Sequence, residues 1–168
     1  MTVTPAILKT LQITEDELAV RLIKDVSEVF NTMVGMDDLL HLPLQIDPVT
    51  HFENCVTAMV GLAGTFNGLI TLHAPQKLAL EFTSSMLGME VTEINDDVRD
   101  ALGEIANMIA GSFKQHLSQG GSDIKMSTPS VVYGNDYFIA AASPMDSLTV
   151  RFATKDDWFM VAVALEIE

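Results

Sequence analysis

The stretch from Asn95 to about Gln119 repeats apolar residues with the period of an α-helix, and this feature constrains the fold most strongly. Asn95 and the aspartates after it are typical of a helix start, and Gly120-Gly121 is typical of a helix end. One broad face of this helix is apolar, and it has to be buried against a sheet or other helices. The opposite side is a narrow polar stripe that contains Asp97, Asp100, Glu104, Asn107, Gly111, Lys114 and Gln115.

Two more helices are expected. Thr14 and Glu17 form a capping-box pattern at the start of a long helix that should end near Gly35 or soon after Asp38. A shorter helix is expected over 78–86, with its end at Gly88. Alternating apolar residues predict strands over 54–62, 66–73, 124–133, 136–142, 148–154 and 158–167.

Strands grouped as hairpins, with helices between the groups, predict an α+β fold. We expect a largely antiparallel sheet with the two long helices packed on one face. The turn residues Gly134-Asn135-Asp136 and Ser143-Pro144 predict turns between strands. In the last strand Phe159, Val161, Val163, Leu165 and Ile167 should share one face.

Composition excludes several classes of protein. Of the 168 residues, 48% are apolar, which is enough for one substantial core. A net charge of −14 argues against nucleic acid and against anionic membrane surfaces as partners. The sequence shows no signal-peptide pattern and no apolar run of the ~20 residues that a membrane helix needs. The single cysteine, Cys55, favours a reducing compartment, and we expect a cytoplasmic location.

The sequence contains a short internal repeat. Glu28, Asn31 and Gly35 on the first long helix match the spacing of Glu104, Asn107 and Gly111 on the later one. We interpret residues 1–168 as a single domain built from two duplicated halves, about 14–74 and 95–168. Chance is an alternative explanation, because only three positions of the two copies are identical.

The polar stripe is the candidate functional site. Glu104 and Asn107 are neighbours one helical turn apart. Gly111 lies one turn beyond Asn107, and a glycine inside a helix costs about 1 kcal/mol relative to alanine, which suggests a close approach to the backbone there. A solvated helix face is the simpler explanation of such a stripe, and spacing alone favours it.

A wider pattern changes that balance. Asp100, Glu104 and Asn107, followed by Pro129 after twenty-one intervening residues, resemble the signature of the CheC/CheX/FliY phosphatases. Met86-Leu87-Gly88 before the helix and the segment 129–134 after it are also similar to CheX. The resemblance covers roughly 53–167, and a single full motif points to CheX. It implies a CheC-like fold.

The resemblance also implies a function, the hydrolysis of the aspartyl phosphate of a CheY-like response regulator. The regulator would supply Mg²⁺ and a lysine, and this chain would need no cofactor of its own. Asn107 would orient the attacking water, since a carboxamide both donates and accepts hydrogen bonds. Glu104 would pair with the regulator's lysine, while Asp100, Gly111 and Pro129 would support the site. The family also implies a homodimer.

Alternatives remain at this level. The same fold could dock a receiver domain or an adaptor protein without catalysis, or could serve as a structural part of the flagellar switch. Glu28 and Asn31 are predicted to form a second or vestigial site, because Lys24 replaces the aspartate and no proline matches Pro129. No metal site is expected, since His41, His51, His73 and His116 lack metal-ligand spacing.

Overall fold

The computed structural model describes residues 3, 5–41, 46, 49–117, 119–140 and 146–167. Its helices are α1 (Pro5–Leu11), α2 (Glu15–Val29), the π-helical turn η1 (Phe30–Val34), α3 (Gln76–Leu87), α4 (Asp96–Phe113) and the 3₁₀ turns η2 (Lys114–His116) and η3 (Gln119–Gly121). Its strands are β1 (Leu40–His41), β2 (His51–Gly64), β3 (Phe66–Pro75), β4 (Ile124–Met126), β5 (Ser130–Phe138), β6 (Asp146–Ala153) and β7 (Trp158–Ile167).

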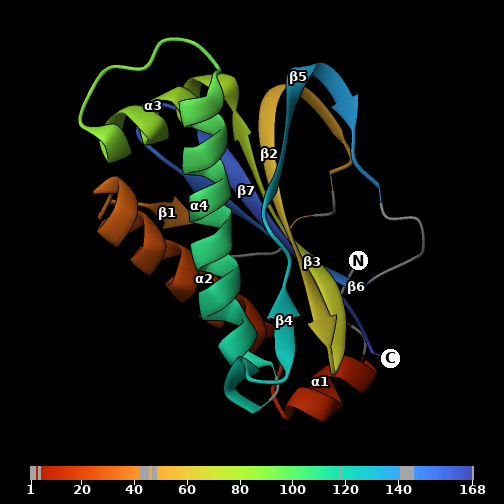
Figure 1. Ribbon diagram of the computed structural model, residues 1–168. Helices are drawn as coiled ribbons and strands as arrows, with labels where there is room; N and C mark the ends of the chain where they lie inside the picture. Colours follow the sequence, from red (N-terminus) through yellow and green to blue (C-terminus); the bar gives the residue numbers. More distant parts are fainter. Residues whose placement is uncertain are drawn as a thin grey trace.

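All seven strands form one sheet in which every printed pairing is antiparallel. The order is β1-β6-β7-β3-β2-β4, and β5 pairs with β2 beside β4. The long helices α2 and α4 and the shorter α3 lie on one face of this sheet (Figure 1). The predicted α+β fold is therefore confirmed. No helix in the described part of the chain is long and apolar enough to cross a membrane.

The core lies between the helices and this face of the sheet. Phe159, Val161, Val163 and Leu165 of β7 are buried as the alternation predicts. Phe30 at the end of α2 stacks on Phe159 with 4.7 Å between ring centroids. The sheet and the long helices are thus joined through aromatic contacts as well as aliphatic ones.

Helix ends follow the predicted signals closely. The Thr14 hydroxyl accepts the backbone N–H of Glu17 at 3.1 Å, and the Glu17 carboxylate accepts the N–H of Thr14 at 2.7 Å. Gly35 and Gly88 end their helices with φ of 76° and 67°, a conformation that suits glycine. The last helix is shorter than predicted, because it ends at Phe113 and a 3₁₀ turn follows.

Three predictions about local structure were wrong, and one helix was not predicted. The strand expected over 124–133 is interrupted at 127–129, which separates β4 from β5. β5 continues through the expected turn at 134–136, because its edge stays paired with β2 from Ser130 to Phe138. The predicted strand over 136–142 is not a separate element, and the expected turn at Ser143-Pro144 lies outside the described residues. The helix α1, which buries Ile7, carries Pro5 at its first position.

The strand order has an internal symmetry. Reading outward from the central pair β7-β3, each side continues with one long strand, β6 or β2, and ends in an edge element, β1 or the β4/β5 pair. Each half would contribute a helix, an edge element and two central strands. This arrangement supports the proposal that the halves 14–74 and 95–168 arose by duplication.

Candidate active site

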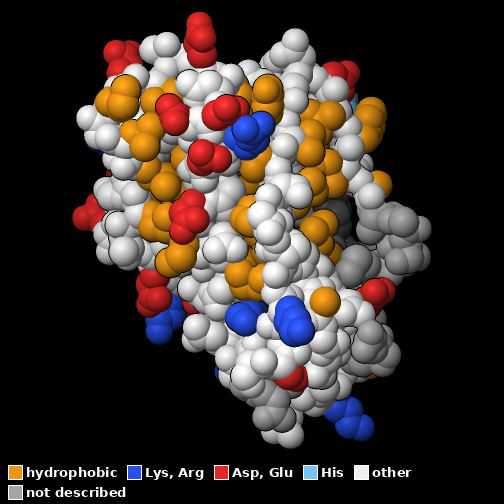
Figure 2. All heavy atoms as spheres, in the orientation of Figure 1, with side chains coloured by type: hydrophobic (Ala, Val, Ile, Leu, Met, Phe, Trp, Pro, Cys, Tyr) orange, Lys and Arg blue, Asp and Glu red, His pale blue; other side chains and the backbone are white. Residues whose placement is uncertain are grey.

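The polar stripe of α4 lies on the outer surface of the helix. Asp100 and Glu104 are exposed, and Asn107 is partly exposed. The opposite side of the helix is buried, with Val98, Leu102, Ile105, Ile109 and Phe113 inaccessible to solvent. Figure 2 shows acidic side chains gathered over α4, with hydrophobic side chains over the strands beside it. The predicted division into a core face and a polar face is therefore present.

The first turn of α4 is held by local polar contacts. The side chain of Asn95 accepts the backbone N–H of Val98 at 3.2 Å, which caps the helix. Arg99 pairs with Asp96 at 2.8 Å on the exposed surface. Because the carboxylates of Asp96 and Asp97 lie near the positive end of the helix dipole, they favour the helical state.

Gly103 is the point at which the chain after α4 returns to the helix. A Cβ atom on Gly103 would lie 3.4 Å from Cβ of Pro129 and 3.7 Å from Cγ2 of Val131. The predicted supporting residue Pro129 is therefore brought beside the turn that carries Glu104. Sequence reasoning missed the role of Gly103, although a second helical glycine one turn before Asn107 was a signal for it.

Gly111 differs from Gly103. A Cβ atom there would meet only the sulfur of Met126 on β4, at 4.0 Å. Met126 belongs to a strand that Lys114 helps to hold, since the Lys114 ammonium donates to the carbonyl oxygen of Ile124 at 2.9 Å. The surface beside Gly111 is thus open. Within the described chain, no atom from another segment would come closer than 4.0 Å to a Cβ at this position.

Asn107 therefore lies between two helical glycines, one packed against a strand and one open. Because Gly103, Asn107 and Gly111 are spaced by four residues, they lie on the same side of the helix. The Asn107 carboxamide, which donates and accepts hydrogen bonds, and the Glu104 carboxylate lie together on the outer face of α4. Such a site can orient a reactant, but the pocket around the reacting atoms has to come from a partner.

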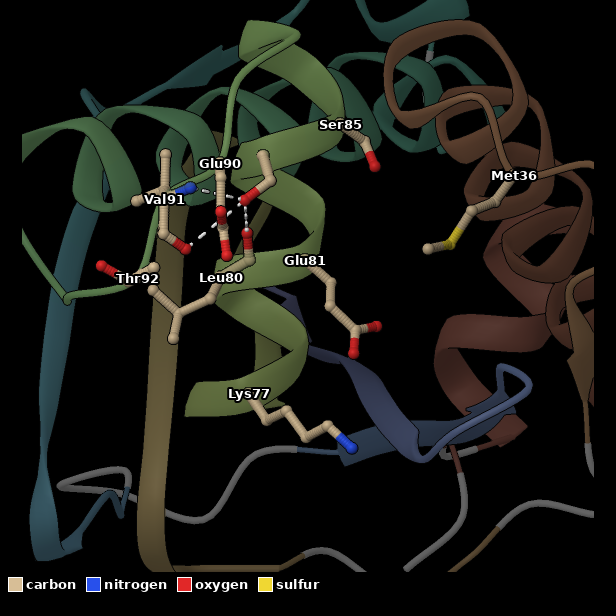
Figure 3. Close-up of a pocket in the computed structure, with 9 residues that line it drawn as sticks. Met36, Lys77, Leu80, Glu81, Ser85, Glu90, Val91 and Thr92 are labelled. Carbon is tan, nitrogen blue, oxygen red and sulfur yellow. Dashed lines mark hydrogen bonds between the residues drawn. The ribbon is translucent and has the colours of Figure 1, made fainter.

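Two grooves lie away from these residues. A groove of about 600 Å³ runs beside α3 and is lined by residues that include Met36, Lys77, Glu81 and Ser85. In Figure 3, Lys77, Glu81 and Ser85 project from α3 toward the side where Met36 lies. A second groove, of about 450 Å³, is formed by β1 and the β6–β7 hairpin. Neither groove includes Asp100, Glu104 or Asn107.

The second Glu–Asn pair has a different setting. Glu28 and Asn31 are exposed, as predicted, but Asn31 lies in the π-helical turn η1, so the helix changes its winding between them. Lys24 lies 4.0 Å from the Glu28 carboxylate. Gly35 ends the helix, whereas its counterpart Gly111 lies inside α4. The geometry of the α4 stripe is therefore not repeated on α2.

The histidines have other partners. His73 is bound through Nδ1 to the Thr57 hydroxyl at 2.8 Å, and His116 is bound through Nε2 to Asp25 at 2.8 Å. His51 contacts Asp136. Among the residues that the structure describes, no group of three or more His, Cys, Asp or Glu side chains could hold a metal ion.

Comparison with known proteins places these features in a family. A sequence model described as chemotaxis phosphatase CheX matches residues 56–153, more than half of the chain. The chain belongs to the CheX family. The match contains α4 and Pro129, so the predicted site lies inside the part that defines membership in the family.

Individual relatives agree with this assignment. The CheY-P phosphatase CheX of Thermotoga maritima is 26% identical over 140 residues, which are 82% of this chain and 88% of that protein. A CheX crystal structure from Desulfovibrio desulfuricans is 28% identical, with a TM-score of 0.73 over 89% of this chain and 99% of that chain. A chemotaxis protein from Desulfovibrio vulgaris Hildenborough is 29% identical, with a TM-score of 0.75 over 89% and 97%.

Proposed function

We propose that this chain hydrolyses the aspartyl phosphate of a CheY-like response regulator. The observation that carries the proposal is the position of Asn107, beside Glu104 on an exposed helix face within the segment that matches the CheX family. A relative over most of the chain is named a CheY-P phosphatase. Asn107 and Glu104 are the catalytic residues in this proposal, and Asp100, Gly111 and Pro129 support them.

The chemistry needs little from this chain. The regulator holds the phosphoryl group, its Mg²⁺ and a lysine, so no cofactor has to bind here. The Asn107 carboxamide accepts a hydrogen bond from the attacking water and holds it in line with phosphorus. The Glu104 carboxylate pairs with the regulator's lysine. Because positioning alone supplies much of the acceleration in phosphoryl transfer, an exposed helix face is sufficient.

The charge of the stripe restricts the kind of partner surface that can dock on it. Asp96, Asp97, Asp100 and Glu104 are all exposed along α4. A regulator surface that offers Lys or Arg beside its phosphorylated aspartate would be attracted to this stripe, and the attraction would weaken with added salt. The single cysteine favours a reducing compartment, and a cytoplasmic location, where such regulators work, is part of the proposal.

The test is the decay of aspartyl phosphate on CheY-like regulators from the same genome, with Mg²⁺ present. Wild-type protein should accelerate the decay. Asn107→Ala should lower the turnover rate by ~10²-fold or more, about 3 kcal/mol, while binding is retained. Binding without any acceleration by the wild type would support the alternative, a non-catalytic module that docks receiver domains.

A homodimer is part of the proposal. Trp158 is 45% exposed, and Met160, Ala162 and Ala164 of β7 are partly exposed on the sheet face opposite the helices. Apolar strand surface of this kind is commonly covered by a partner. Sedimentation over a range of concentrations should give the mass of a dimer, and a monomer mass at every concentration would contradict this part.

A further inference from the structure

Tyr133 on β5 has an exposed side chain. It pairs across the sheet with Val56, which is fully buried beneath the helices. Residues directly opposite in an antiparallel pair point to the same face, so Tyr133 projects toward the helical side of the sheet. Its side chain nevertheless remains 50% exposed, because β5 lies at the margin of the sheet.

The contacts of the neighbouring residues place Tyr133 along α4. Met126 lies nearest to Gly111, and Pro129 and Val131 lie nearest to Gly103. The chain from β4 to β5 thus runs antiparallel to α4, toward the start of the helix. Two further strand residues advance about 7 Å, which corresponds to between four and five helical residues. By this estimate Tyr133 is level with the turn that contains Arg99 and Asp100.

We propose that Tyr133 is an anchor for the receiver domain that docks on the α4 stripe, and that it sets affinity for the regulator without taking part in the chemistry. This inference rests on the proposed phosphatase function. The surface is continuous with that function's site, since Pro129 and Val131 of the same segment contact the helix that carries Asn107.

The character of the side chain fits this role. Tyrosine presents a large rigid contact area with a polar tip, and it is enriched among the residues that dominate binding energy in interfaces. Here the ring is held on a strand that is paired with β2 over its whole length, so little conformational freedom is lost on docking. The acidic stripe attracts a basic partner, and the ring supplies apolar contact at its border.

The sequence offers a matched control. Val132 is 37% exposed and adjacent to Tyr133, but it points to the opposite face, where it pairs with Thr57. We would compare Tyr133→Ala, Tyr133→Phe and Val132→Ala with the wild type. Tyr133→Thr is a second variant, because its β-branched side chain keeps the strand propensity if alanine weakens the edge. Thermal unfolding of each protein checks that it is folded.

Two measurements are needed for each variant. The first is binding of a regulator loaded with beryllofluoride and Mg²⁺, and the second is the kinetics of aspartyl-phosphate decay. Tyr133→Ala and Tyr133→Thr should raise Kd and KM by about tenfold or more and leave kcat within twofold. Tyr133→Phe should lose less than threefold, and Val132→Ala should match the wild type.

The outcomes separate the two proposals. Unchanged Kd and KM in folded Tyr133→Ala and Tyr133→Thr, with active wild type, would overturn the anchor and leave the phosphatase function intact. An equal loss in Val132→Ala would also overturn it, since the effect would then come from the strand as a whole. If the wild type binds the loaded regulator, the Tyr133 variants weaken that binding and no hydrolysis is seen, the anchor proposal stands and the phosphatase function is refuted. Failure of the wild type to bind or hydrolyse would remove both.

Discussion

Gly103 of α4 and Pro129 ahead of β5 are in contact: a Cβ atom at position 103 would lie 3.4 Å from the Pro129 Cβ. This contact joins the helix that carries Asn107 to the strand that carries Tyr133. A Cβ at position 103 would just fit at van der Waals distance, so there is no room for a larger side chain without movement of the strand segment. A bulkier residue would have to push that segment away.

Gly103→Val is accordingly expected to lower the free energy of unfolding by about 1–3 kcal/mol, because its methyl groups would overlap Pro129 and Val131. Phosphatase activity should fall as well, since the segment beside Asn107 shifts. Urea unfolding and aspartyl-phosphate decay measure the two effects. A variant with unchanged stability and activity would show that this contact is dispensable.

Gly111→Ala, unlike Gly103→Val, should raise the free energy of unfolding. The nearest atom to the new Cβ is the Met126 sulfur at 4.0 Å, so no clash arises, and the helix should gain up to about 1 kcal/mol. If a regulator approaches the backbone here, KM should rise although the protein is more stable. Urea unfolding and steady-state kinetics on the same preparation test this combination, and a stabilised variant with wild-type KM would rule out a docking role for Gly111.

Glu104→Ala should separate binding from chemistry. Because its proposed partner is a lysine of the regulator, loss of the carboxylate should raise KM along with any fall in kcat, whereas Asn107→Ala should lower kcat almost alone. Glu104→Gln, which keeps the size but removes the charge, should resemble Glu104→Ala at low salt. The Glu104 and Asn107 variants should each change the free energy of unfolding by no more than about 0.5 kcal/mol, since both side chains lie on the surface stripe. The same split in kcat and KM for both residues would contradict the separate roles.

Asn31→Ala should leave the activity within twofold of the wild type. The π-helical turn separates Asn31 from the regular winding of α2, and Lys24 already lies beside Glu28. The measurement is again aspartyl-phosphate decay, compared directly with Asn107→Ala. A loss as large as that of Asn107→Ala would mean that α2 carries a working site.

His73 should make stability depend on pH. Burial lowers its pKa from 6.5 to about 4, since the charged ring would lose its hydration beside Phe52. Between these values the unfolded chain binds a proton that the native protein does not. The free energy of unfolding should therefore fall by about 3 kcal/mol as the pH drops from 6.5 to 4.

The control for this prediction is His73→Gln, which removes the titrating ring but can still bond to the Thr57 hydroxyl. Urea unfolding at several pH values should give a shallower slope for the variant across that window. Acidic groups such as Glu17, whose pKa is lowered by hydrogen bonds to Thr14, contribute equally to both proteins. Parallel slopes would show that His73 is not the responsible group.

Local signals in the sequence predicted the helical part of the fold well. The capping box at Thr14 and the glycines at 35 and 88 act within a few residues, so their effects can be read from the chain alone. The placement of Glu104 and Asn107 on an exposed face followed from helical periodicity in the same way. Their catalytic roles remain predictions.

Features that depend on distant partners were harder to predict. Gly134 reads as a turn residue, but pairing with Cys55 keeps it within β5. The π-helical turn at Asn31 and the contact of Gly103 with Pro129 depend on packing between segments far apart in the sequence. Positions of this kind carry little signal in one sequence, because tertiary contacts override local preference there.

The order of the strands has a consequence for folding. In the proposed halves 14–74 and 95–168, β1 of the first half pairs with β6 of the second, and β4 and β5 of the second half pair with β2 of the first. The two halves therefore exchange their edge elements, and neither can complete its share of the sheet without the other. Because most of this pairing joins segments distant in the chain, the sheet should assemble late and in one cooperative step. Cutting the gene between the halves should yield two fragments that fold only when they are mixed.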